Sequence, residues 1–281
     1  MRLLSYRGEE GPAAAVRIAD RVFDAGGLLG EKPTSVRALL AADRLDDLGE
    51  AAASPAAEPL DDASLQPLPP IPDPDKIVCV GLNYRSHAAE AGIEPPEAPT
   101  FFAKFRNALA PTGAEVPLPP ASEKVDYEAE VAFAIGRRCA GVNPGEALAH
   151  VAGYTLLNDL SARDLQFATP QWMPGKVFDG SAPCGPELVT PDEAGSPDAI
   201  EFELELNGET MQSASTADLI FSVPELVSRL SRLMTLEPGD LIATGTPAGV
   251  GSVRDPRVWL RTGDEIAISS PTLGRLETRI A

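Results

Sequence analysis

The chain has 281 residues, enough for one large domain with an ample core and a smaller one beside it. Its formal net charge of −19 argues against a nucleic-acid or anionic-membrane partner. No apolar run approaches the roughly 20 residues of a membrane span, and the first residues lack the apolar core of a signal peptide. The three cysteines are scattered without C-x-x-C spacing and indicate neither a disulfide framework nor a zinc site, so we expect a reduced, cytoplasmic location.

Residues 1–54 predict a small α+β domain, with short strands at 3–6, 14–18 and 21–23 and a helix at 35–42. Residues 55–75 contain seven prolines among alanines and aspartates, a composition that resists regular structure. We interpret this segment as an extended connector, and we assign residues 76–281 to a second, larger domain.

The second domain is predicted to consist mostly of strands, with buried ones at 77–80, 131–135, 154–157 and 241–243. Residues 200–206 lead into Asn207-Gly208, which favours a tight hairpin turn, and 266–269 are expected to pair with 276–280. One helix is predicted after Ser222, which forms a capping box with Glu225. Apolar residues then recur at helical spacing as a predicted core stripe: Leu226, Val227, Leu230, Leu233 and Met234. These patterns predict a strand-dominated α+β fold.

Three carboxylates are expected to converge at the ends of two strands. Glu128 and Glu130 are two residues apart beside the run 131–135, so they point to the same face, and Asp159 ends the run 154–157. Clustered carboxylates repel one another unless protons or a cation neutralise them, and Mg²⁺ prefers such oxygen ligands. A solvated edge strand is the commoner explanation for an isolated E-x-E. The apolar strand behind the pair and the second acidic segment favour a metal site.

His87 and Glu90 are three residues apart, so on one helical turn they share a face and can form a hydrogen bond. A carboxylate that fixes the imidazole tautomer is what a general base requires. An ordinary charged pair on a surface helix is the competing interpretation. The only other histidine, His150, is interpreted as structural.

Further polar residues are candidates for substrate binding. Arg163 and Gln166 lie four and seven residues after Asp159, so they would line one wall of the site if Asp159 begins a helix. Arg163 suits recognition of a carboxylate, and Lys176 offers a second cation for an oxyanion. Thr246 can donate its hydroxyl or its backbone N–H to a substrate carboxylate, although glycine-rich loops are more often simple turns. The role of Lys104 is left open.

Five motifs occur in a recognisable order: N-Y-R-S-H-A-A-E at 83–90, D-Y-E-A-E at 126–130, N-D-L-S-A-R-D-L-Q at 158–166, Q-W-M-P-G-K at 171–176 and T-G-T-P-A-G-V-G at 244–251. On these motifs the chain resembles the fumarylacetoacetate hydrolase superfamily, in its acylpyruvate hydrolase and 2-hydroxyhepta-2,4-diene-1,7-dioate isomerase branch. The resemblance implies a mixed β-sandwich roll, a His87–Glu90 acid/base dyad, a homodimer, and Mg²⁺ as cofactor, with Mn²⁺ or Ca²⁺ as alternatives.

One departure from the family pattern narrows the range of expected substrates. The namesake hydrolases carry an additional aspartate ligand upstream of their histidine, whereas this chain has Asn83 and no aspartate between Lys76 and Glu90. The resemblance therefore implies three protein ligands to the metal. It disfavours fumarylacetoacetate itself and favours short acylpyruvates, oxaloacetate or ring-cleavage products of aromatic catabolism.

The resemblance implies, as the leading hypothesis, metal-dependent hydrolysis of a C–C bond in an acylpyruvate-like 2,4-dioxoacid through a metal-stabilised pyruvate enolate. Lys176, with Arg163 or Gln166, would hold the oxyanion formed at the distal carbonyl. The alternatives at the same site are decarboxylation of oxaloacetate and isomerisation or decarboxylation of a 2-oxo-heptenedioate. A hypothesis of another class is a non-catalytic metabolite-binding protein. The intact His87–Glu90 pair argues against it, because a sensor needs no acid/base pair.

Overall fold

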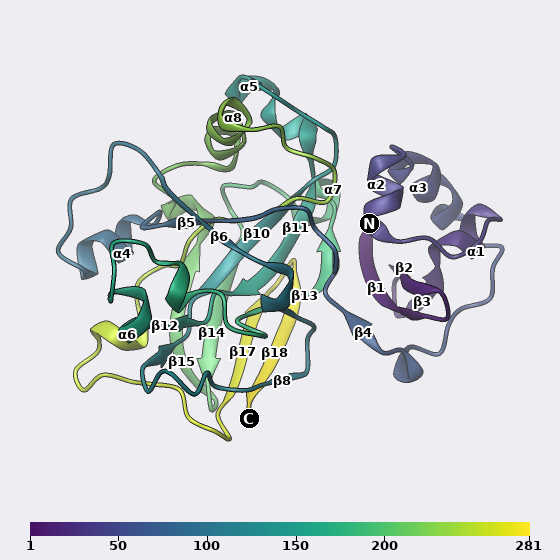
Figure 1. The fold of residues 1–281 in the computed structure, drawn as a ribbon. Helices are drawn as coiled ribbons and strands as arrows, with labels where there is room; N and C mark the ends of the chain where they lie inside the picture. Colours follow the sequence, from purple (N-terminus) through teal and green to yellow (C-terminus); the bar gives the residue numbers. More distant parts are fainter.

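The computed structural model describes residues 1–281, and an eleven-stranded mixed sheet runs through most of the molecule (Figure 1). In spatial order its main strands are β3 (Arg21–Asp24), β2 (Gly11–Ile18), β1 (Arg2–Gly8), β13 (Ala182–Val189), β11 (Val151–Asn158), β10 (Ala129–Ile135), β16 (Leu241–Ala243), β5 (Ile77–Gly81) and β6 (Thr100–Lys104). Two short strands join its side: β4 (Pro67–Leu68) pairs with β1, and β7 (Leu109–Ala110) pairs with β13. Every residue of β10 and β11 is buried, which explains their almost continuous apolar sequence.

A second sheet of five strands packs against the first. Its order is β15 (Glu209–Ser215), β14 (Glu201–Leu206), β17 (Glu265–Ser270), β18 (Gly274–Ile280) and β8 (Ala114–Val116). One core cluster of 39 buried residues joins the two sheets, with Phe133 and Leu156 from the first and Leu204 and Ile268 from the second. This sheet-on-sheet core confirms the predicted strand-dominated α+β fold.

The predicted hairpin and the predicted C-terminal pairing are confirmed. Asn207 and Gly208 join β14 to β15 with φ angles of 53° and 81°, the positive values that the tight hairpin turn requires. Strands β17 and β18 pair antiparallel.

Helices are short and lie outside the sheets. They are α1 (Ala25–Leu29), α2 (Val36–Ala41), α3 (Leu45–Ala53), α4 (Arg85–Glu90), α5 (Pro144–Ala147), α6 (Arg163–Gln166), α7 (Pro191–Ala194) and α8 (Val223–Leu233). Single 3-10 turns occupy Asp62–Ser64, Arg106–Ala108, Leu148–His150, Met173–Gly175, Thr216–Asp218 and Gly251–Val253. None of the helices is long and apolar enough to cross a bilayer.

Helix α8 begins as predicted, with the capping box between Ser222 and Glu225 in place. Its buried face includes Leu226 and Leu230. The prediction that Leu233 and Met234 belong to the core is wrong, because their exposed fractions are 69% and 37%. Leu233 is the last residue of the helix and Met234 is its C-cap, so both lie past the buried part of the helix, which ends at Ser231.

The N-terminal segment lies to one side of the molecule, around β1 to β3 and α1 to α3 (Figure 1). Strand β1 nevertheless shares the large sheet with β13, through the pairs Arg2–Val189 and Leu3–Leu188. The proline-rich residues 55–75 contribute β4, which pairs with β1. The division into domains at 1–54, 55–75 and 76–281 stays a prediction.

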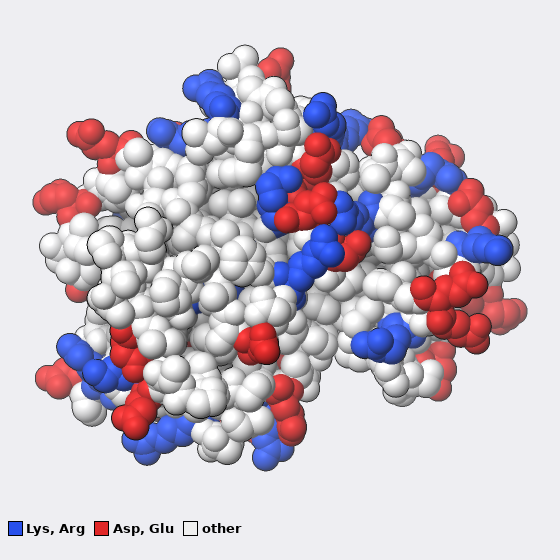
Figure 2. Space-filling view, viewed as in Figure 1, with Lys and Arg blue, Asp and Glu red and all other residues white.

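Charged side chains of both signs gather where the N-terminal segment meets the rest of the molecule, and acidic ones dominate its outer edge (Figure 2). One of the ion pairs between the two parts joins Arg137 Nε to Asp43 Oδ1 at 2.9 Å.

Candidate active site

The three predicted carboxylates converge at one end of β10 and β11. Glu128 immediately precedes β10, Glu130 lies within it, and Asp159 follows β11. The antiparallel register sets Asp159 opposite Glu128, and the Asp159 N–H donates to the Glu128 carbonyl at 2.9 Å. All three side chains are buried, and one oxygen from each lies within 4.8 Å of the others. The alternation of side chains along β10 thus brings about the convergence that the sequence predicts.

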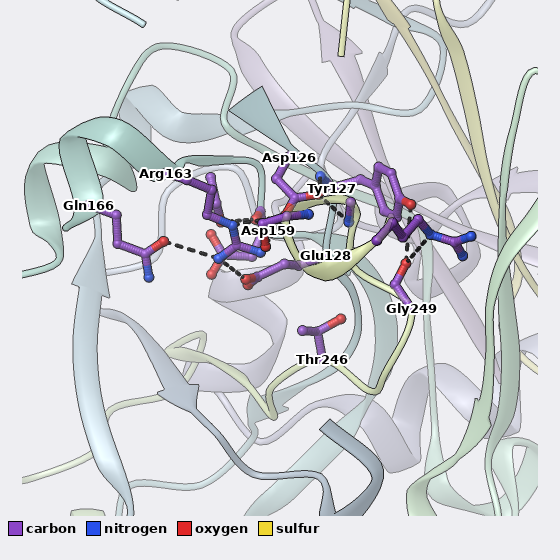
Figure 3. A network of polar contacts seen from close by, with 12 residues as sticks. Asp126, Tyr127, Glu128, Asp159, Arg163, Gln166, Thr246 and Gly249 are labelled. Atoms are coloured by element: carbon purple, nitrogen blue, oxygen red, sulfur yellow. Dashed lines mark hydrogen bonds and ion pairs between the residues drawn. The ribbon is translucent and has the colours of Figure 1, made fainter. Parts of the chain in front are cut away.

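Buried cations compensate two of these carboxylates. Lys176 Nζ lies 2.8 Å from Glu128 Oε2 and 2.7 Å from Asp159 Oδ2. Lys104 Nζ donates to the other Asp159 oxygen at 2.6 Å. Arg163 Nη1 lies 2.6 Å from Glu128 Oε1. Figure 3 shows this contact as a dashed line. Burial opposes ionisation of Glu128, but Lys176 and Arg163 outweigh it and lower its pKa to about 2.

Glu130 is the carboxylate that lacks a partner cation. Burial, and then the neighbouring charges of Asp159 and Glu128, raise its pKa well above the usual value. Its Oε2 accepts the N–H of Gly245 at 2.7 Å. Gly245 has a φ of +98°, and a Cβ there would lie 2.8 Å from the Val80 carbonyl, so only glycine fits this close approach.

This donor set fits a hard divalent cation. Glu128, Glu130 and Asp159 offer carboxylate oxygens only, without thiolate or imidazole, which suits Mg²⁺ or Mn²⁺ and disfavours softer metals. A cation would also relieve the repulsion that weighs on Glu130. The charges of the cluster therefore allow one more positive group beside Glu130.

The segment before Lys176 packs closely against α6. A Cβ at Gly175 would lie 2.5 Å from the Ala162 carbonyl and 2.6 Å from Gln166, so the Q-W-M-P-G-K loop needs glycine here. The close packing sets the next residue, Lys176, in the interior, where its exposed fraction is only 2%.

Arg163 and Gln166 lie on one helical turn, but that helix does not begin at Asp159, so the condition attached to their spacing is not met. Residues Ser161–Ala162 form β12, which pairs with β9 (Val125–Asp126) and keeps the chain extended until α6 begins at Arg163. The guanidinium of Arg163 donates to Asp126 Oδ2 at 2.8 Å and to Gln166 Oε1 at 3.0 Å. Together with Glu128, these acceptors occupy most of the N–H donors of the guanidinium. The main role of Arg163 is therefore to stabilise the site rather than to bind a ligand.

Sequence reasoning missed Asp126, although it stands in the D-Y-E-A-E motif. Its Oδ1 accepts the N–H of Gly251 at 2.7 Å, and its Oδ2 accepts the N–H of Ser252 at 3.0 Å and Nε of Arg163. The motif residue next to it, Tyr127, donates its hydroxyl to the Gly249 carbonyl at 3.1 Å (Figure 3). One buried carboxylate therefore ties the loop after Thr246 to α6.

The His87–Glu90 pair forms on α4 as its spacing predicts. Nδ1 of His87 lies 3.4 Å from Glu90 Oε2, and the other Glu90 oxygen accepts the N–H of Gly249 at 2.9 Å. The backbone of the T-G-T-P-A-G-V-G loop therefore fixes Glu90, which in turn orients the imidazole. Nε2 of His87 is left for a ligand.

The hydroxyl of Thr246 is already engaged within the protein. It donates to the Ala129 carbonyl at 2.9 Å and accepts Nε2 of Gln212 at 2.8 Å. Its backbone N–H has no acceptor in the protein, so of the two donors suggested by the sequence, only this one is free.

A cavity of 520 Å³ collects most of the predicted site residues: His87, Glu128, Glu130, Arg163, Gln166, Lys176 and Thr246. Asp159 and Glu90 lie behind this lining and support it. The apolar part of the cavity wall includes Phe102, Trp172 and Trp259. A larger cleft of 1250 Å³ between the N-terminal segment and the rest contains none of the predicted residues.

A buried acidic triad beside a histidine–carboxylate pair, at one cavity of a two-sheet fold, has the composition of a candidate enzyme active site. Residues 76–281 match the pattern of the fumarylacetoacetate (FAA) hydrolase C-terminal domain. The chain belongs to the fumarylacetoacetate hydrolase family, whose members are hydrolases, isomerases and tautomerases.

Three relatives illustrate that range. A mitochondrial oxaloacetate tautomerase of Bos taurus is 42% identical over 215 residues, which cover 76% of this chain and 68% of the relative. The solved structure of a suggested HpcE protein of Mycobacterium smegmatis has a TM-score of 0.89 at 36% identity, covering 100% of this chain and 99% of that one. Maleylpyruvate hydrolase of Sphingobium, solved with manganese and pyruvate, has a TM-score of 0.81 at 29% identity and the same coverage.

Proposed function

We propose that this enzyme interconverts the keto and enol forms of oxaloacetate or a closely related 2-oxoacid, with a divalent cation held by Glu128, Glu130 and Asp159. The observation that carries this proposal is that His87 lines the same cavity as the carboxylates, with one ring nitrogen free. Similarity to an oxaloacetate tautomerase supports the choice of substrate. Mn²⁺ in a structural relative supports a divalent cation, of which Mg²⁺ is our first choice.

Different residues of the chain would have different roles in this reaction. Nε2 of His87 accepts a proton from C3 of the keto form and returns a proton to the 2-oxygen, which yields the enol. The cation, when bound, supplies Lewis acidity toward the 2-oxoacid. Lys176 brings a buried positive charge to the cavity wall, which favours negative charge on the substrate oxygen. The free N–H of Thr246 accommodates a substrate carboxylate.

Hydrolysis of an acylpyruvate is the second candidate, and similarity to maleylpyruvate hydrolase favours it. His87 would then take a proton from water, which attacks the distal carbonyl; the C–C bond breaks to give a 2-oxoacid and a carboxylic acid. The cavity of 520 Å³ also has room for such a longer substrate. Decarboxylation of oxaloacetate uses the same C3 position and needs no attacking water. A homodimer and a cytoplasmic location stay predictions.

Parallel assays test the proposal. Loss of the enol absorbance of oxaloacetate, pyruvate release from oxaloacetate and pyruvate release from acetylpyruvate are measured with Mg²⁺, with Mn²⁺ and with EDTA. Metal-dependent acceleration of the first process alone supports the tautomerase. Rapid cleavage of acetylpyruvate without tautomerase activity would favour the hydrolase over the proposed tautomerase. Activity that EDTA leaves unchanged would contradict the role of the three carboxylates in metal binding.

A further inference from the structure

Four Lys and Arg side chains line the cavity, and they fall into two kinds. Arg163 and Lys176 are buried and paired with carboxylates. Lys124 and Arg257 are exposed at the cavity, and neither lies within 4.0 Å of an acidic group. Their side chains make no hydrogen bond to the protein either. The chain has a net charge of −19, so acidic side chains are abundant enough to pair with most cations. Two unpaired cations at one cavity are therefore unexpected.

The loop that carries Arg257 is fixed by backbone hydrogen bonds at its two ends. The N–H of Val258 donates to the Gly251 carbonyl at 3.0 Å, so the loop returns to its own start. The N–H groups of Gly251 and Ser252 both donate to Asp126, at 2.7 and 3.0 Å. Arg257 is therefore presented by a fixed segment rather than by a loose one.

The same backbone network reaches Lys124. The N–H of Leu260 donates to the Val125 carbonyl at 2.8 Å, and the N–H of Arg163 donates to the Lys124 carbonyl at 2.9 Å. Lys124 and the segment after Arg257 thus lie beside the strand that leads into the carboxylate triad. The backbone that carries each cation is therefore fixed relative to the metal-binding end of the cavity.

One acidic residue, Asp164, also lines this part of the cavity, but its oxygens are already occupied. They accept the hydroxyl of Ser122 at 2.5 Å and the N–H groups of Glu123 and Leu165 at 3.3 and 3.0 Å. Asp164 is therefore part of the local backbone structure, and it leaves the two cations to an external anion.

We infer that Lys124 and Arg257 form a second anion site, which receives the far carboxylate of a 2-oxo dicarboxylic acid. The inference rests on the proposed function, because the carboxylates at the other end of the cavity must engage the 2-oxo end of the same molecule. Arg257 is the main determinant, since a guanidinium binds a carboxylate through two parallel hydrogen bonds. Lys124 contributes as a point charge. The enzyme should therefore prefer dicarboxylates to monocarboxylates of equal length.

Binding measurements on the metal-loaded protein test this site. Dissociation constants are compared for matched pairs with four, five and six carbons: oxaloacetate and 2-oxobutanoate, 2-oxoglutarate and 2-oxopentanoate, 2-oxoadipate and 2-oxohexanoate. We expect the wild type to bind at least one dicarboxylate about tenfold more tightly than its partner. Arg257→Gln should reduce that preference to about twofold and leave monocarboxylate binding unchanged, Lys124→Gln should reduce it partly, and KCl should weaken it.

Arg261→Gln is the matched control, because Arg261 is exposed in the same segment but does not line the cavity. Equal affinities within every pair, or a preference that survives Arg257→Gln, would overturn the second anion site while leaving the proposed function intact. If the metal-loaded wild type binds none of the six acids and no pyruvate, the proposed function and this inference both fail.

Discussion

Lys104 Nζ donates to Asp159 Oδ1 across 2.6 Å, and both side chains are fully buried. The residue that the sequence left without a role thus holds one oxygen of a predicted metal ligand, while Lys176 holds the other. Because Lys104 ends β6 and does not line the cavity, it acts on the site through Asp159 alone. We interpret it as a positioning residue.

Lys104→Met should lower the free energy of unfolding of the metal-free protein by about 3 kcal/mol, because it leaves a buried carboxylate short of a partner. A divalent cation would restore positive charge beside Asp159, so added Mn²⁺ should stabilise the variant more than the wild type. Urea denaturation with and without Mn²⁺ measures both effects. Lys76→Met, which breaks the Lys76–Asp240 pair and leaves the three carboxylates untouched, is the control. Equal stabilisation of wild type and Lys104→Met by Mn²⁺ would falsify this interpretation.

His87→Ala should reduce kcat/KM for the tautomerisation by 10²-fold or more, the usual contribution of a general base. Binding of Mn²⁺ should be unchanged, since His87 is not one of the three carboxylates. His150→Ala is the matched control, because the ring of His150 lies outside the cavity and forms its hydrogen bond with the Arg137 carbonyl, at 3.2 Å. Oxaloacetate decarboxylation should survive His87→Ala in part. A variant with full tautomerase and hydrolase activity would remove His87 from the mechanism.

The two oxygens of Glu90 have separate partners, so two substitutions should give different kinetic results. Glu90→Gln keeps an acceptor for the N–H of Gly249 but alters the group that faces His87, and we expect kcat to fall about tenfold with KM little changed. Glu90→Ala also releases the Gly249 loop, which carries Thr246, and should raise KM as well. Steady-state kinetics on both variants separate the effects. Identical changes in kcat and KM would show that Glu90 has only one role.

Metal binding can be tested without turnover through Glu130. Its carboxylate is repelled by Asp159 and Glu128 and has no cation partner, so the neutral Glu130→Gln should keep or increase the Tm of the metal-free protein. The amide oxygen can still accept the N–H of Gly245. The increase in Tm that Mn²⁺ gives the wild type should be lost, because the site then has two carboxylates instead of three. A full Mn²⁺ response in this variant would place the cation elsewhere.

Several features of the fold and the site were predictable because they depend on local rules. The alternation of side chains along a strand explains why Glu128 and Glu130 share a face, and helical spacing explains the contact of His87 with Glu90. The turn at Asn207-Gly208 follows from the backbone angles that these two residues tolerate. The catalytic roles of these residues stay predictions.

Other features depend on which distant segments meet, and no local pattern encodes that. Asp126 contacts Arg163 across 37 residues of sequence, and Lys104 contacts Asp159 across 55. Because their partners could not be identified, Asp126 was missed and Lys104 had no role. The extended backbone after Asp159 has the same kind of cause, since pairing of β12 with β9 overrides local spacing. The repeated carboxylates of the D-Y-E-A-E motif were the available signal for Asp126.

Asp126 gives the strongest test of how the loop and α6 support the cavity. In Asp126→Asn the amide NH₂ must take the place of either Oδ2, which accepts Nε of Arg163 and the N–H of Ser252, or Oδ1, which accepts the N–H of Gly251. In either orientation a donor faces a donor, so a buried contact becomes repulsive. We expect a loss of about 2–4 kcal/mol in the free energy of unfolding. KM should rise more than kcat falls, because Asp126 holds the wall residues Arg163 and Arg257 but touches no reacting atom. Denaturation and steady-state kinetics measure both. Asp126→Glu keeps the charge and should recover part of the affinity; an unchanged KM in Asp126→Asn would show that the loop keeps its position without this carboxylate.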